Sequence, residues 1–101
     1  MATYAELATI RSDDTEWGNF LAKVRVAAVI KATEIIDSTT PGEAALEWAR
    51  STIANPAASG DSIVWYVVGK NDNLALSAIY GASDTAIQTN VGAAVDAIYG
   101  G

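Results

Sequence analysis

The sequence predicts an all-α fold, a compact small helical bundle of about five to six helices around one long central helix. Half of the residues are apolar and 18% are charged, which is typical of a folded chain rather than a disordered one. Apolar residues recur mainly at helical spacing, and capping residues precede several of these runs. Because 101 residues suffice for one modest core, we expect residues 1–101 to form a single helical domain.

The first helix is predicted from the capping-box spacing of Thr3 and Glu6. In such a box the Thr hydroxyl accepts from a backbone N–H in the first turn, while the Glu side chain reaches back to the cap. Leu7 and Ile10 then supply a short apolar face, and Arg11 lies at the negative end of the helix dipole. A helix of about two turns follows from this pattern.

A long second helix is expected from about Asp14 to Asp37, with Asp13 as its cap. Its first apolar stripe contains Trp17, Phe20, Leu21, Val24, Ala28, Ala32, Ile35 and Ile36, and its second contains Val26, Val29, Ile30 and Thr33. A helix that is apolar nearly all round is normally the buried centre of a bundle, or is covered by neighbouring subunits. Lys31 and Glu34 are one turn apart and are expected to pair.

The third helix is predicted to start at Thr40-Pro41-Gly42-Glu43, with Thr40 as cap, Pro41 at the first helical position and Glu43 closing the box. It should end at Asn55-Pro56. The turn before it is short, so this helix should pack antiparallel to the long one.

The run Ile63–Val68 is ambiguous between strand and helix. Its β-branched and aromatic residues are typical of a strand. However, no partner strand is evident nearby, and a lone strand would leave an open edge. We therefore favour a helix from Ser59 or Asp61 to about Lys70, with Ile63 on its apolar side.

The C-terminal part is predicted to hold a loop and two further helices. Asn71–Asn73 forms the loop, and a short helix through Leu74–Ile79 stops at Gly81. Ser83 caps the last helix. Its apolar face consists of Ile87, Val91, Ala94, Val95 and Ile98.

The composition excludes most of the common catalytic mechanisms. The chain contains neither His nor Cys, so it has no imidazole base, no thiolate nucleophile and no Cys/His zinc site. Asp13, Asp14 and Glu16 could in principle bind a hard cation, but helix capping explains all three. We expect no enzyme activity, no catalytic residues, no metal and no cofactor.

The charge narrows the classes of partner. Six basic residues against twelve acidic ones give a net charge of −6, and the basic residues are scattered. Specific nucleic-acid binding and binding to an anionic membrane surface are therefore not expected, since both depend on clustered Lys and Arg. The longest uncharged apolar run, Ile63–Gly69, is also far shorter than the roughly 20 residues of a membrane span.

The aromatic residues allow two interpretations. Trp17, Trp48 and Trp65 lie on apolar faces of three predicted helices, which favours a shared aromatic core. Alternatively, some of them contribute to an interface, because Trp and Tyr are frequent in interface hot spots and a domain of this size has a thin core. The candidate interface residues are Trp17, Val26, Ile30, Trp65, Tyr66, Tyr80 and Tyr99.

Four segments resemble small virion proteins of tailed bacteriophages. They are Ala2–Leu7, Val24–Ala27 with Ile30, Leu46–Ala49 and Asp84–Val91. The chain departs from that pattern in the apolar run Ile63–Val68. The resemblance implies a structural component of the head or of the head–tail junction, and it carries no catalytic residue over to this chain.

Within that resemblance, we expect a head-to-tail connector, also called a neck or head-completion protein, that assembles as a ring-like homo-oligomer. Its partners would be itself and other virion proteins such as portal, neck or capsid subunits. Its location would be the virion, after assembly in the cytoplasm of the bacterial host. Two alternatives stay open: a capsid decoration protein, and a small phage-encoded regulator that binds a host protein.

Overall fold

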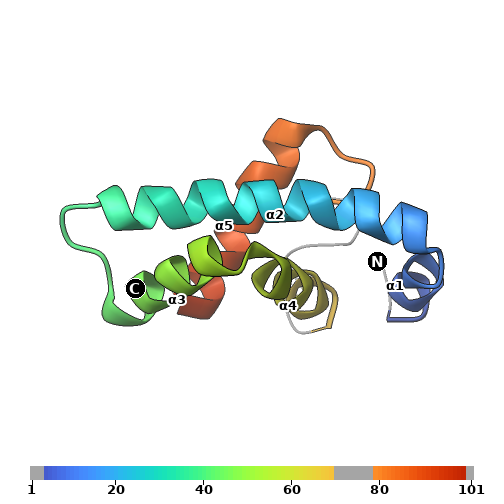
Figure 1. Cartoon of the computed structure of the whole chain (residues 1–101), viewed down its shortest axis with the longest axis horizontal. Coiled ribbons are helices and arrows are strands. Elements are labelled where there is room, and N and C mark those ends of the chain that lie inside the picture. The colour runs from blue at the N-terminus through green and yellow to red at the C-terminus, as the bar shows by residue number, and fades with distance from the viewer. Residues whose placement is uncertain (1–3, 70–78, 100–101) are drawn as a thin grey trace.

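The long helix α2 organises the molecule (Figure 1). The computed structural model describes residues 4–69 and 79–99, and within these ranges all of the regular secondary structure is α-helical. The helices are α1 (Tyr4–Arg11), α2 (Asp14–Asp37), α3 (Glu43–Ala54), α4 (Pro56–Gly69) and α5 (Asp84–Tyr99). The 24 residues of α2 span about 36 Å, close to the full 40 Å length of the molecule, and the other four helices pack against it. The predicted all-α bundle around one long central helix is confirmed.

Side-chain caps set the start of two helices as predicted. The Asp13 carboxylate accepts a hydrogen bond from the backbone N–H of Glu16 at 2.9 Å, and α2 begins at Asp14. The Ser83 hydroxyl accepts from the N–H of Ala86 at 3.2 Å, immediately before α5. The first helix also has the predicted length of about two turns, whereas its proposed cap Thr3 lies outside the described residues.

The predicted cap of the third helix is wrong. The helix begins at Glu43, and its cap is Gly42, which has extended backbone angles and no side-chain hydrogen bond. The first helical backbone bond runs from the N–H of Leu46 to the carbonyl of Gly42, so the helix begins two residues after Pro41, the predicted first position. The predicted end before Pro56 is confirmed, and α3 runs back antiparallel along α2 (Figure 1).

The run Ile63–Val68 is helical, as favoured above, but α4 starts earlier than predicted, at Pro56. Proline suits the first turn of a helix because its missing N–H has no partner to lose there. Ile63 and Val64 are buried against the rest of the bundle. Gly60 is buried too, and α4 approaches α2 closely at this glycine.

The predicted loop Asn71–Asn73 and most of the short helix Leu74–Ile79 lie outside the described residues. Ile79 itself is fully buried. Gly81 has a φ of 77°, the left-handed conformation expected of a glycine that follows a helix end.

The core lies between α2 and the helices that surround it. Ala27, Ala28 and Ala32 of α2 are buried, and small residues of this kind let neighbouring helices approach closely. Trp48 belongs to the core cluster, and Trp17 and Trp65 pack against that cluster as partly buried residues, so all three contribute to the core. The aromatic rings form two groups. The ring centroids of Trp17 and Trp65 are 6.4 Å apart, whereas Trp48 stacks on Tyr99 with 5.5 Å between centroids.

Candidate functional site: the outer face of α2

One side of α2 is not covered by any described helix and is largely apolar. Its residues follow from helical periodicity and from their exposure: Asn19, Ala22, Lys23, Val26, Val29, Ile30, Thr33, Ile36 and Asp37. We call this set the α2 outer face. Within the described parts of the chain, four large apolar side chains are exposed, and three of them lie here: Val26 at 58%, Ile30 at 37% and Ile36 at 40%.

The apolar residues of the α2 outer face have the spacing of a coiled-coil seam. Ala22, Val26, Val29, Thr33 and Ile36 are separated by four, three, four and three residues. The Thr33 hydroxyl donates a hydrogen bond to the Val29 carbonyl at 2.9 Å, so its donor is satisfied within the helix. A partner helix could therefore cover this seam without leaving that hydroxyl proton unpaired.

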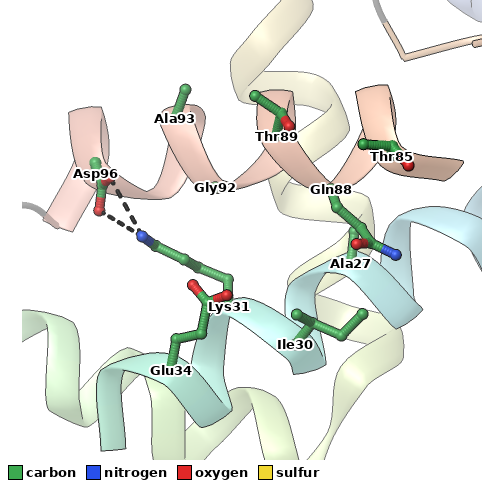
Figure 2. Close-up of a pocket in the computed structure, with 10 residues that line it drawn as sticks. All are labelled: Ala27, Ile30, Lys31, Glu34, Thr85, Gln88, Thr89, Gly92, Ala93 and Asp96. Carbon is green, nitrogen blue, oxygen red and sulfur yellow. Dashed lines mark hydrogen bonds and ion pairs between the residues drawn. The ribbon is translucent and has the colours of Figure 1, made fainter. Parts of the chain in front are cut away.

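Where α5 passes α2, the α2 outer face continues into two grooves. Figure 2 shows the larger one, a hollow of about 390 Å³. Ile30 lines it from α2, and Thr85 and Thr89 line it from α5. The smaller groove, of about 210 Å³, includes Val26 and Gln88. Val26 and Ile30, two of the predicted interface residues, thus stand at the edges of open grooves.

An ion pair crosses the larger groove. Lys31 lies 3.1 Å from a carboxylate oxygen of Asp96 on α5, so the predicted partner Glu34 on its own helix is wrong (Figure 2). The methylene stem of Lys31 runs past Gly92 on its way to Asp96, with its Cδ 3.6 Å from where a β-carbon of Gly92 would stand, which is an ordinary contact distance.

Two predicted interface residues, Trp17 and Trp65, form a second cluster on the opposite side of α2 from the outer face. Both are half-buried, and the Arg11 guanidinium lies 5.8 Å from the ring centroid of Trp17 and 5.4 Å from that of Trp65. We call Trp17 and Trp65 the aromatic edge. Tyr80 does not belong to it: its ring packs edge-on against Phe20, 5.2 Å between centroids, and lines a hollow with Asn19 and Lys23 of the α2 outer face.

The two remaining candidates lie elsewhere. Tyr66 is half-buried on α4, and Tyr99 is half-buried in its stack with Trp48. The structure therefore divides the seven candidates between the α2 outer face, the aromatic edge, Tyr80 beside the outer face, and these two positions. Sequence reasoning missed Ile36 as a surface residue, because it was assigned to the core stripe; its spacing of seven from Val29 was the signal that could have found it.

Three further observations concern metal binding, membrane spans and a buried polar atom. Among residues 4–69 and 79–99, no three His, Cys, Asp or Glu side chains gather as a group that could hold a metal ion. No helix in the same ranges is long and apolar enough to cross a bilayer. The Nε of Arg25 is buried and has no hydrogen-bond partner in the described part of the chain.

Comparison with known proteins gives no match: no family model, no curated protein and no solved structure corresponds to this chain.

Proposed function

We propose that this chain is a structural component of a tailed-phage virion, a head-to-tail connector or neck protein that assembles as a ring. The observation that carries the proposal is the α2 outer face. On this face the large apolar side chains of Val26, Ile30 and Ile36 are exposed to solvent. A contiguous exposed apolar surface of this kind marks a site of protein association.

A ring needs two different surfaces on each subunit, since its contacts are heterologous. The α2 outer face supplies one. The aromatic edge supplies the other, because Trp17 and Trp65 are half-buried and large aromatic side chains are frequent at interface centres. The two surfaces point away from each other across α2, as neighbours in a closed ring require.

The charge of the chain suits a channel through which DNA passes. With a net charge of −6, a ring of such subunits would repel the phosphate backbone rather than retain it. The resemblance of four sequence segments to small virion proteins of tailed phages supports the same assignment. The neighbours in this role would be portal, neck or capsid subunits.

Mass spectrometry of purified phage particles tests the proposal, followed by location of the chain's density in the particle. We expect the chain in intact virions, in multiple copies at the junction of head and tail. Copies spread over the shell would make it a decoration protein instead. Absence from particles together with abundance in infected cells would refute a virion role and favour a regulator of a host protein.

A further inference from the structure

We propose that in the free protein the α2 outer face is covered by a second copy of the same chain. The two α2 helices would lie antiparallel, related by a two-fold axis near Ile30. An interface of this symmetry is isologous: if a residue of one copy contacts a given residue of the other, the reverse contact is also made. The proposal goes beyond the virion role and shares with it only the claim that the chain self-associates.

The charges on the α2 outer face select this arrangement. Lys23 and Asp37 have opposite signs, and each lies seven residues from Ile30, about 10 Å along the helix. Glu34, which is also exposed, lies at the edge of the face, in the groove that Ile30 lines. In an antiparallel pair centred on Ile30, Lys23 of each copy lies beside Asp37 of the other. A parallel pair would instead place Lys23 and its copy on opposite flanks of the seam, and likewise Asp37, so neither residue would meet a charge of opposite sign.

The apolar residues match in the same register. Val26 of one copy packs near Thr33 and Ile36 of the other, and the two Ile30 side chains meet at the axis. Val26, Val29, Thr33 and Ile36 then lie near one another across the pair, whereas Ala22 lies opposite the end of the partner's α2. Because the Thr33 hydroxyl already donates to Val29, its proton remains bonded within the pair.

The same geometry limits the strength of the pair. Most of the buried area would come from a single helix of each copy, and each copy carries a net charge of −6. Small interfaces belong to weak, transient complexes, and the mutual repulsion of two acidic copies is reduced by salt. We therefore expect a dimer that forms more readily at 500 mM than at 50 mM NaCl. It would have to open before the α2 outer face met a different surface in a ring.

Sedimentation velocity of the purified chain over a range of concentrations tests the pair. We expect a concentration-dependent dimer for the native chain and at least a tenfold weaker one for Val26→Asp, which puts a carboxylate into the seam. Ile53→Asp is the matched control, because Ile53 is 46% exposed but lies on α3. Far-UV circular dichroism checks that both variants stay helical. A native chain that is monomeric at every concentration and salt overturns the proposal.

Cross-linking tests the register, and the chain is well suited to it because it has no Cys. With a short bismaleimide, Lys23→Cys mixed with Asp37→Cys should give a cross-linked heterodimer, whereas Lys23→Cys alone should stay monomeric on a denaturing gel. Ready cross-linking of Lys23→Cys to itself would overturn the antiparallel arrangement. If the purified chain is monomeric but is found in virions, the antiparallel dimer is refuted and the virion role is supported. If the chain forms the dimer but is absent from virions, the virion role is refuted and the dimer is supported.

Discussion

Gly60 of α4 lies directly against the side chain of Arg25 in α2. A β-carbon added to Gly60 would stand 3.0 Å from the Cγ of Arg25, with the Arg25 backbone N and Cα at 3.7 and 3.8 Å. This contact involves the base of the Arg side chain rather than its flexible end. Because the Arg25 Nε is also buried, this part of the side chain is enclosed and has little room to move aside. Gly60 therefore sets how closely α4 can approach α2.

The first prediction follows from that contact. Gly60→Ala should lower the free energy of unfolding by about 1 kcal/mol, because overpacking costs about 1–3 kcal/mol and the gain in helix propensity recovers less than about 1 kcal/mol. Urea denaturation followed by circular dichroism measures the change.

Gly18→Ala is the control for that measurement. Gly18 is inside α2, where an added β-carbon would have no neighbour within 4 Å. This substitution should raise the free energy of unfolding by about 0.5–1 kcal/mol. Equal effects of the two substitutions would contradict the close approach of α4 to α2.

The second prediction concerns helix caps. Asp13→Ala removes the acceptor of the Glu16 N–H and should lower the free energy of unfolding by about 1 kcal/mol. Thr40→Ala should change it by less than about 0.5 kcal/mol, because Thr40 is exposed and the cap of α3 is Gly42. Thermal melts of the two variants measure these losses of stability. A larger loss for Thr40→Ala than for Asp13→Ala would show that the cap lies at Thr40 after all.

The caps also show how far the sequence determines the fold. Local signals placed α2 correctly at both ends, because the cap at Asp13 and the periodicity of its apolar residues agree. They failed at Thr40: the spacing of Thr40 and Glu43 and the proline between them favour a helix start at Pro41, yet the helix begins at Glu43 with Gly42 as its cap. The local pattern did not distinguish a start at Pro41 from one two residues later.

The candidate site was predicted only in part for a related reason. Val26 and Ile30 were identified because a helix that is apolar all round must be covered on every side. The sequence could not tell which stripe the bundle itself covers, so Ile36 was assigned to the core although it is 40% exposed. Similarly, Lys31 pairs with Asp96, which is 65 residues away, because the packing of α5 against α2 brings the two side chains together.

The third prediction separates the two roles of Lys31. Its ammonium is paired at the surface, where the Asp96 side chain is 63% exposed, and exposed ion pairs contribute about 0–1 kcal/mol. A double-mutant cycle of Lys31→Met and Asp96→Asn should thus give a coupling below about 1 kcal/mol that vanishes in 1 M NaCl. Lys31→Ala should destabilise the protein more than Lys31→Met, because it also removes the stem that covers Gly92. Equal costs for these two substitutions would mean that the stem contributes nothing.

The fourth prediction concerns the end of α5. Tyr99 is the last residue of α5 and stacks on Trp48 of α3, with ring planes 25° apart. Stacked aromatic pairs contribute about 0.5–1.5 kcal/mol beyond the area they bury. Tyr99→Leu should thus destabilise the fold by about 1 kcal/mol, and Tyr99→Ala by about 2–3 kcal/mol, since it also empties the space beside Trp48.

Fluorescence quenching locates that effect. In the Trp17→Phe/Trp65→Phe background Trp48 is the one remaining indole, and at 7% exposure it should be poorly quenched by acrylamide. Adding Tyr99→Ala should raise the quenching constant severalfold, because the ring that shields one side of Trp48 is gone. Adding Tyr80→Ala provides the matched control: it removes a ring that packs on Phe20, so it should destabilise the protein while leaving Trp48 shielded. If both additions raise the quenching equally, Trp48 is exposed by general loosening and the stack with Tyr99 does not hold the end of α5 on α3.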